Sequence, residues 1–153
     1  RDLHKEYRLQ GQMCIRDSGG IEKFYGEIQT VQCEHSNSVV KDIVKNNGKG
    51  KVLFISHTGK DLCSMVGDQI AQIAYENQWS GIVVDGYVRD VEVIKDIQIG
   101  LYAKNTFPKK TDKTVGTGQI NVPFKLKEIN IVPGYWIYVD CNGWAISNSK
   151  LEF

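Results

Sequence analysis

The sequence lacks an excess of either charge and contains no apolar run long enough to cross a membrane. Its 19 basic and 18 acidic residues leave a formal net charge of +1, so no overall positive field attracts nucleic acid or an anionic membrane. The longest apolar runs, such as Ile82-Val83-Val84, fall far short of the ~20 residues of a membrane helix, and no basic segment precedes an apolar one as in a signal peptide. We therefore expect a cytoplasmic protein with no direct nucleic-acid or membrane partner.

Cysteine and histidine pairs with metal-site spacing are also missing. Cys14, Cys33, Cys63 and Cys141 are widely separated, and no two histidines have ligand spacing. This argues against a structural zinc site and favours reduced, buried thiols. With 153 residues, of which 41% are hydrophobic and 24% charged, the chain has the composition of one globular domain rather than of a disordered or fibrous protein.

The first eighteen residues lack the periodicity that predicts a helix or strand. They begin without Met, mix charge and polarity with no clear period, and run into Gly19-Gly20. Residues 13–18 resemble translated adapter sequence, so we predict that residues 1–18 are a non-native or disordered segment, with a native mobile arm as the alternative. A single domain is then expected over residues 19–153, truncated at its N-terminal side.

Two continuous apolar runs predict the strands of a buried parallel sheet. Residues 51–56 and 81–85 have the apolar character of strands that helices cover on both faces. Between them lies a predicted helix that Asp68 caps. Its inward stripe consists of Ile70, Ala71, Ile73, Ala74 and Tyr75. The order strand, helix, strand predicts a right-handed parallel crossover.

The flanking segments extend this core. Alternating polarity predicts a strand over residues 25–33, and helical spacing predicts a helix over residues 39–44, which the polar residues 36–38 cap. A short helix is expected from residue 89 onward. Further strands are predicted at residues 97–104, 119–124, 135–139 and 144–147. The fold class is therefore α/β, with a short parallel core and a mostly β C-terminal half.

Two loops are expected at the carboxyl ends of the two buried strands, where ligands bind in open α/β sheets. These loops, residues 56–68 and 85–90, should face each other. The first ends at a helix N-terminus, where the free N–H groups of Gln69 and Ile70 can hold a carboxylate or phosphate. Gly67 lets such an anion approach the backbone.

The second loop presents Arg89 beside Asp90. Arg89 would stabilise negative charge as it develops on a carbonyl oxygen. The carboxylates of Asp90 and Asp68 are hard oxygen ligands that favour a partly hydrated Mg²⁺ or Mn²⁺, and Asp68 could also hold a water that moves a proton. These residues suit a metal-assisted reaction on a small acid; the alternative is that the Arg-Asp pair is a structural ion pair or cap at a helix start.

The spacing of these residues resembles the RraA-like family. Asp68 stands in Gly67-Asp68-x-x-Ala71, and twenty residues separate it from Arg89-Asp90 within the run 81–91. Similar motifs continue to the C-terminal side: Asp96-Ile97-x-Ile99-Gly100, Pro108, Gly116-x-Gly118, Val122-Pro123, Pro133-Gly134, Tyr138-Val139-Asp140 and Asn142-Gly143. The resemblance covers about residues 19–147. This family contains class II 4-hydroxy-4-methyl-2-oxoglutarate and 4-carboxy-4-hydroxy-2-oxoadipate aldolases, and the regulators of ribonuclease activity A.

The resemblance implies a swivelling β/β/α domain, a homotrimer with active sites between subunits, and a divalent cation. It implies that Asp90 holds the metal largely through water and that Arg89 binds the pyruvyl oxygen and steadies the enolate. It further implies that Asp68 orients or activates a water, while the amides of Gln69 and Ile70 receive the pyruvate carboxylate.

Two functions follow from the resemblance. The first is cleavage of 4-hydroxy-4-methyl-2-oxoglutarate to pyruvate, with oxaloacetate decarboxylation as a side activity through the same enolate. The alternative is a non-catalytic regulator that binds and inhibits a ribonuclease E-type enzyme. The sequence also departs from the family's aldolases: an Asp followed by three glycines is Ser56-His57-Thr58-Gly59 here, a basic loop residue is Leu62, and an acid three positions after the Arg-Asp pair is Val93.

Two remaining features favour structural interpretations. Residues 104–127 contain six lysines and one acid, for which a solvated face is expected and a binding surface is the alternative. His57 is expected to be a loop histidine rather than a catalytic base.

Overall fold

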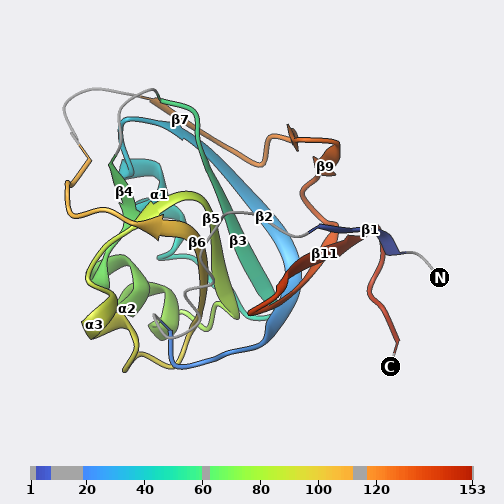
Figure 1. The fold of residues 1–153 in the computed structure, drawn as a ribbon, viewed down its shortest axis with the longest axis horizontal. Helices are drawn as coiled ribbons and strands as arrows, with labels where there is room; N and C mark the ends of the chain where they lie inside the picture. Colours follow the sequence, from blue (N-terminus) through green and yellow to red (C-terminus); the bar gives the residue numbers. More distant parts are fainter. Residues whose placement is uncertain (1–2, 8–18, 60–62, 112–116, 153) are drawn as a thin grey trace.

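The computed structural model describes residues 3–7, 19–59, 63–111 and 117–152 (Figure 1). Its helices are α1 (Ser38–Ile43), α2 (Asp68–Glu76) and α3 (Val91–Ile94). Its strands are β1 (Leu3–Tyr7), β2 (Phe24–Glu34), β3 (Lys51–His57), β4 (Ser64–Val66), β5 (Gly81–Val88), β6 (Gly100–Thr106), β7 (Thr117–Ile120), β8 (Phe124–Leu126), β9 (Ile129–Ile131), β10 (Trp136–Asp140) and β11 (Gly143–Ser147). None of the described helices is long and apolar enough to span a membrane.

Most of these strands form one mixed sheet. Its order is β1-β11-β10-β2-β3-β5-β4, with β6 beside β5 and β7 beside β2, while β8 and β9 form a separate hairpin. The neighbours β2, β3, β5 and β6 run parallel, whereas β10, β11 and β1 continue the sheet antiparallel. The predicted α/β class, with a short parallel core and a mostly β C-terminal half, is confirmed.

The apolar run of β3 is buried on both faces, as its sequence predicts. Leu53 and Ile55 belong to one hydrophobic cluster, and Val52 and Phe54 belong to the other. All four side chains have no exposed surface. Because successive side chains of a strand point to opposite faces, a strand with a core on each side requires apolar residues at every position.

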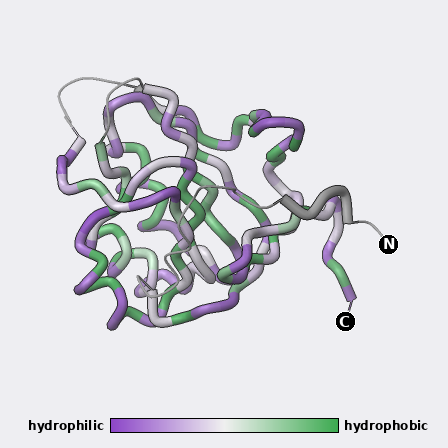
Figure 2. The backbone as a smooth tube through the Cα atoms, viewed as in Figure 1, coloured by the Kyte–Doolittle hydropathy of each residue, from purple (hydrophilic) through white to green (hydrophobic). Residues whose placement is uncertain are grey.

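The three helices contribute to the first of these clusters, and the antiparallel strands close the second. Residues of α1, α2 and α3 pack with Leu53 and Ile55, whereas residues of β9, β10 and β11 pack with Phe54. Figure 2 shows hydrophobic segments in the middle of the molecule and hydrophilic stretches along the outer loops. Both faces of the parallel core are therefore covered.

A strand that the sequence does not predict shapes the candidate site. β3 pairs with β5 only as far as Ser56 and Asp85. Farther along, β4 pairs with β5 through Tyr87 and Val88, on the edge opposite β6. The expected loop 56–68 therefore contains a strand, and residues 85–88 belong to β5 rather than to a loop. This pairing places the end of β4 beside the end of β5.

Helix α2 forms between the two apolar runs, as predicted, but Asp68 is its first residue rather than its cap, and the predicted inward face has one error. Ile70, Ala71 and Ala74 are buried and Ile73 is half-buried, but Tyr75 is 46% exposed. Tyr75 lies about 140° around the helix from Ile70, since each residue advances by about 100°. The predicted inward stripe was therefore too wide.

Two further segments, one at the N-terminus and one at residues 119–124, differ from expectation. Within residues 1–18, Leu3–Tyr7 form β1 along β11, and residues 8–18 lie outside the described residues. The strand predicted at residues 119–124 is two strands, β7 and β8, in different sheets. Asn121, with φ 57°, and Pro123 lie at the break between them, where neither a left-handed residue nor a proline favours a continuous ladder.

Candidate active site

The N-terminus of α2 meets the end of β5, as the sequence predicts for the two facing loops. Gly67 precedes α2, and the N–H of Asp68 donates a hydrogen bond to the Asp90 Oδ2 atom at 3.3 Å. The Arg89 guanidinium donates to the same oxygen at 2.9 Å. The pairing of β4 with β5 fixes this contact, because the N–H of Arg89 donates to the Val66 carbonyl at 3.0 Å.

Asp90 caps α2, the role that the sequence assigned to Asp68. The N-cap residue of α2 is Gly67, and no side chain of the helix itself makes a capping hydrogen bond. The carboxylate of Asp90 takes that role because a helix N-terminus favours a negative charge. The structural alternative for the Arg-Asp pair is thus also realised, since the two side chains form an ion pair.

Asp90 also begins α3 with its backbone. Its φ of 62° lies in the left-handed region, which residues other than glycine seldom adopt. Its carbonyl accepts hydrogen bonds from the N–H groups of Val93 and Ile94, each at 3.0 Å. One residue therefore starts one helix and caps another, so its carboxylate is held in a defined place.

The close approach of these side chains leaves little room for a Cβ atom at Gly67. A Cβ atom at this position would lie 2.8 Å from Asp90 Oδ2 and 3.1 Å from Arg89 Cζ. The backbone of Gly67 is extended, with φ −123°, so space rather than backbone conformation selects glycine here. The structure therefore places Gly67 against both charged groups of the site.

The first turn of α2 offers N–H groups for an anion. The first intrahelical bond runs from the Ala71 N–H to the Gly67 carbonyl at 3.1 Å. The N–H groups of Gln69 and Ile70 thus precede the hydrogen-bonded ladder of the helix. Arg89 and Asp90 beside them keep 27% of their side-chain surface exposed, so a small ligand can reach this point from solvent. The structure brings together all six predicted site residues: Gly67, Asp68, Gln69, Ile70, Arg89 and Asp90.

A cavity of about 640 Å³ adjoins this turn, between α2 and the segment around α3. No local sequence pattern predicts it, because its walls come from two segments that are separated in the sequence. Its lining residues are Asp68, Gln69, Gln72, Ile73, Val93, Asp96 and Ile97.

The donor set fits a cation held mainly by water. In the described part of the chain, no three His, Cys, Asp or Glu side chains gather closely enough to enclose a metal ion. Mg²⁺ commonly keeps several waters and binds through one or two carboxylates. Asp90, and Asp68, whose backbone N–H contacts the Asp90 carboxylate, are the residues that could hold such an ion.

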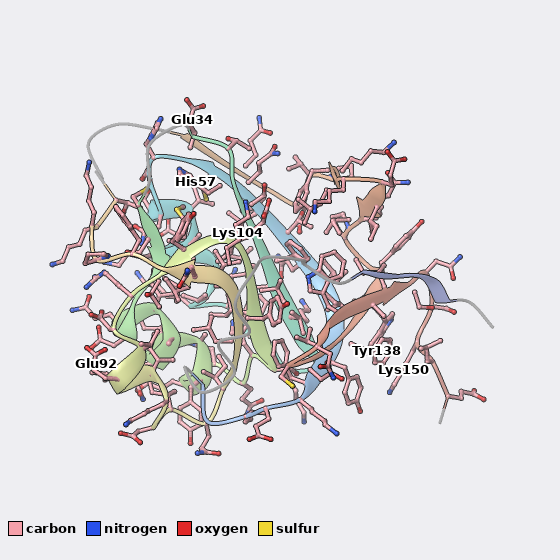
Figure 3. All side chains as sticks on the ribbon, in the orientation of Figure 1. Glu34, His57, Glu92, Lys104, Tyr138 and Lys150 are labelled. Atoms are coloured by element: carbon pink, nitrogen blue, oxygen red, sulfur yellow. The ribbon has the colours of Figure 1, made fainter. Side chains whose placement is uncertain are left out.

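Asp85 does not join this group, although the sequence placed it in the ligand-binding loop. It lies within β5, its side chain is 12% exposed, and its Oδ1 atom pairs with Lys104 Nζ at 3.1 Å. His57 is near this pair, and Figure 3 labels it together with Lys104. His57 is the last residue of β3 rather than a loop histidine.

Burial lowers the pKa of His57, and the neighbouring positive charges of His35 and Lys104 lower it further. Asp85 and Glu34 oppose this shift without reversing it. The Nε2 atom of His57 lies 3.8 Å from the Cys63 sulfur. The described cysteines are free thiols, of which Cys33 and Cys63 are buried and Cys141 is half-buried. Cys14 lies outside the described residues.

The described lysines of residues 104–127 do not form one continuous surface, and Lys113 lies outside the described residues. Lys104 pairs with Asp85, while Lys109 and Lys110 are exposed beyond β6. Lys125 and Lys127 belong to the segment of the β8–β9 hairpin. Figure 1 shows this hairpin far from the segment that follows β6.

Known proteins are similar to this chain in both sequence and fold. The RraA-like family, described as Aldolase/RraA, matches residues 2–146, which include most of the segment predicted to be non-native or disordered. A Shewanella oneidensis protein named "putative 4-hydroxy-4-methyl-2-oxoglutarate aldolase" is 42% identical, over 92% of this chain and 85% of that protein. A Vibrio vulnificus protein of the same name is 39% identical, over 99% of this chain and 94% of its own length.

A solved structure, the RNA-processing inhibitor RraA from Thermus thermophilis, superimposes with a TM-score of 0.87 at 29% identity. The alignment covers 97% of this chain and 87% of that one. The sequence match and the shared fold agree with the family resemblance of the sequence. The chain belongs to the RraA-like family.

Proposed function

We propose that this protein is a divalent-metal-dependent lyase that cleaves 4-hydroxy-4-methyl-2-oxoglutarate to pyruvate, with oxaloacetate decarboxylation as a side activity. The observation that carries the proposal is the convergence of Arg89, Asp90 and the N-terminus of α2, where one carboxylate oxygen contacts both cationic and N–H donors within 3.3 Å. Relatives that are 39% and 42% identical and bear an aldolase name support the same reaction.

The substrate carboxylate would bind at the first turn of α2. The N–H groups of Gln69 and Ile70 donate to it, and the missing side chain of Gly67 leaves room for it. Asp90 Oδ2 already accepts a hydrogen bond at this helix end, so the site accommodates a carboxylate oxygen. The Arg89 guanidinium lies beside it and can contact the 2-oxo oxygen.

The chain's residues then assist the breaking of the bond between C3 and C4. A water oriented by Asp68 accepts the proton of the 4-hydroxyl group, and the C4 oxygen becomes a carbonyl. The electrons of the C3–C4 bond pass to the pyruvyl fragment as an enolate, whose oxygen Arg89 stabilises. Return of a proton to C3 gives pyruvate. Oxaloacetate loses CO₂ to give the same enolate.

Asp90 would hold Mg²⁺ or Mn²⁺, largely through water, with Asp68 as the neighbouring hard donor. When bound, the cation supplies additional positive charge for the developing negative charge of the substrate. We also propose that the chain assembles as a homotrimer with its active sites between subunits, as the family resemblance implies.

Pyruvate release tests this proposal. Purified protein with Mg²⁺ should release pyruvate from 4-hydroxy-4-methyl-2-oxoglutarate and from oxaloacetate, and EDTA should abolish both activities. The substitution Arg89→Ala should lower kcat/KM by about 100-fold, as removal of a donor to a developing oxyanion does. Lys95→Ala, at the exposed end of α3, removes the same charge outside the site and should leave the rate unchanged. No pyruvate from either substrate would reject the proposal.

The second candidate function is inhibition of a ribonuclease E-type enzyme by binding. It is favoured by the similarity to an RNA-processing inhibitor at 29% identity, and by the exposed pair Lys109 and Lys110. A pull-down with such a ribonuclease should then be lost on charge reversal of both lysines and retained by Asp90→Ala. Binding that is lost with Asp90→Ala but retained after charge reversal would contradict it.

A further inference from the structure

We propose that Asn37 is a positioning residue for the carboxylate site at the N-terminus of α2. Its side chain holds β4, the strand that leads directly into Gly67. This role rests on the proposed function, because that site is the one where the N–H groups of Gln69 and Ile70 would bind the substrate carboxylate. Asn37 is not among the site residues predicted from the sequence, and it acts through β4.

The side chain of Asn37 does not take the capping role that the sequence predicts for residues 36–38. Asn37 is the N-cap residue of α1, yet its side chain makes no capping hydrogen bond. Asparagine is favoured at this position because its side-chain oxygen can accept from the first N–H groups of a helix. Here the N–H of Ser38 donates to Ser36 Oγ at 3.3 Å instead. A residue that departs from its local preference in this way is engaged elsewhere in the fold.

The amide of Asn37 joins two segments that are distant in the sequence. Its Nδ2 atom donates to the Met65 carbonyl at 3.0 Å, across 28 positions, and Figure 1 shows α1 beside β4. Its Oδ1 atom accepts from the Thr111 hydroxyl at 2.9 Å, across 74 positions. A carbonyl oxygen can only accept, so the nitrogen of the amide must face Met65. Because Asn37 is 9% exposed and its bond to Met65 is buried, water does not readily replace this donor.

Contacts of this kind hold β4 in place. It is a three-residue strand at the end of the sheet order, beside β5. Ser64 fixes its beginning, because the N–H and the hydroxyl group of Ser64 both donate to the Lys109 carbonyl, at 2.9 and 3.1 Å. Asn37 fixes its middle at Met65, a residue with no exposed surface. Loss of the amide would deprive a buried carbonyl of a donor, which disfavours the observed position of the strand.

The position of β4 determines where the N-terminus of α2 lies. Val66, the last residue of β4, accepts a hydrogen bond from the Arg89 N–H at 3.0 Å, and Gly67 follows as the N-cap residue of α2. A Cβ atom at Gly67 would lie 2.8 Å from Asp90 Oδ2, so the backbone here fits closely against the Arg-Asp pair. Met65 lies just before Val66. A shift of Met65 would therefore displace the N–H groups that follow, and small misplacements of binding groups are costly.

Pyruvate binding tests this role without turnover. Asn37→Ala removes both hydrogen bonds, and titration calorimetry of the full chain with Mg²⁺ should show the dissociation constant of pyruvate rising by about tenfold or more. In oxaloacetate turnover, KM should rise with it. A loss of folded protein would lower kcat and the number of binding sites but leave the dissociation constant and KM unchanged. A rise in both constants therefore distinguishes positioning from a general loss of stability.

Two further variants complete the test. Thr111→Val removes the donor to Asn37 Oδ1 and keeps the bond to Met65, so the dissociation constant should rise by about threefold. Asn77→Ala is the matched control, because Asn77 Nδ2 donates to the Ile73 carbonyl at 2.9 Å, a bond of the same type at the C-terminal end of α2. Its loss should leave pyruvate binding unchanged.

The outcomes separate this role from the proposed reaction. An unchanged dissociation constant in Asn37→Ala would overturn the role, and so would equal rises in Asn37→Ala and Asn77→Ala. If Asn37→Ala does not fold, an unchanged constant in Thr111→Val has the same meaning. Pyruvate binding without turnover would reject the lyase and leave the role of Asn37 intact. No pyruvate binding by the unmodified chain would reject the carboxylate site and this role together.

Discussion

The backbone N–H of Asp68 donates a hydrogen bond to the side-chain carboxylate of Asp90, across 3.3 Å between two segments that are 22 positions apart in the sequence. This contact joins the start of α2 to the start of α3. It exists because β4 pairs with the end of β5, which brings the residues after both strands to one point. The anion-accepting end of α2 and the Arg-Asp pair are therefore parts of a single site.

Gly67→Ala tests how closely this site is packed. The new methyl group would lie 2.8 Å from Asp90 Oδ2 and 3.1 Å from Arg89 Cζ, so both side chains must shift. We expect kcat/KM for pyruvate release to fall by about tenfold or more, since small misplacements of positioning groups are costly. The control Gly86→Ala meets its nearest atoms at 3.4 Å, an ordinary contact, and should change the rate little.

Unchanged activity of Gly67→Ala would show that Asp90 and Arg89 do not need their observed positions. Thermal unfolding of both variants distinguishes a local effect from loss of the fold. We expect both proteins to stay folded, because neither glycine requires a positive φ.

The pH dependence of stability should report the environment of His57. Burial lowers its pKa from the usual 6.5, with further lowering by His35 and Lys104. The unfolded chain then binds a proton at this residue at a higher pH than the native chain does. The contribution of His57 to stability is therefore complete above pH 6.5 and declines as the pH falls from there towards the native pKa.

His57→Gln removes this proton linkage. Melting temperatures measured between about pH 7.5 and about pH 5.5, where histidine titrates, should fall less for the variant than for the unmodified chain. A steeper fall in the variant would mean that His57 binds its proton more tightly in the native protein than in the unfolded chain. That result would contradict the lowering of the His57 pKa by burial.

Cysteine reactivity should follow burial. Burial raises the pKa of the Cys33 thiol to about 12, so almost no thiolate forms near neutral pH, and the side chain is only 1% exposed. Cys141 follows β10 and is half-buried. Brief treatment with iodoacetamide should label Cys141 before Cys33, and Cys33 only after denaturation, as peptide mass mapping can show. Labelling of native Cys33 at the rate of Cys141 would contradict the burial of the Cys33 side chain in β2.

The strands that the sequence predicts most clearly should also determine stability. Phe54 has no exposed surface and makes edge-on contacts with Phe124 and Trp144, with ring centroids at 5.6 and 5.4 Å. Phe54→Ala should lower the free energy of unfolding by about 3–5 kcal/mol, measured by urea denaturation. Tyr75→Ala, at an exposed position of α2, should lower it by about 0.5 kcal/mol or less. Equal losses in the two variants would contradict the assignment of Phe54 to the core.

Local sequence signals are sufficient to predict a strand and its burial where the segment's own residue pattern determines its environment. The apolar runs of β3 and β5 identify strands covered on both faces, because each position in them must be apolar. Gly67 and the Arg89-Asp90 pair mark the ends of segments that a parallel sheet brings to one edge. The site residues could therefore be chosen before their contacts were known.

Features that depend on partners distant in the sequence could not be predicted in this way. β4 has three residues, too few for a period, and only its pairing with β5 makes it a strand. Asp85 resembles a site residue by position, but its ion pair with Lys104 of β6 directs it elsewhere. The capping of α2 by Asp90 likewise depends on a contact between two segments.

The most direct test of the account is a crystal structure of the protein with Mg²⁺ and oxalate, a small mimic of the pyruvate enolate. We predict one oxalate carboxylate within hydrogen-bond distance of the Gln69 and Ile70 N–H groups, the Arg89 guanidinium beside its other end, and the cation on the side of Asp90. Oxalate bound away from α2, with the contact between Asp68 and Asp90 unchanged, would contradict the proposed site.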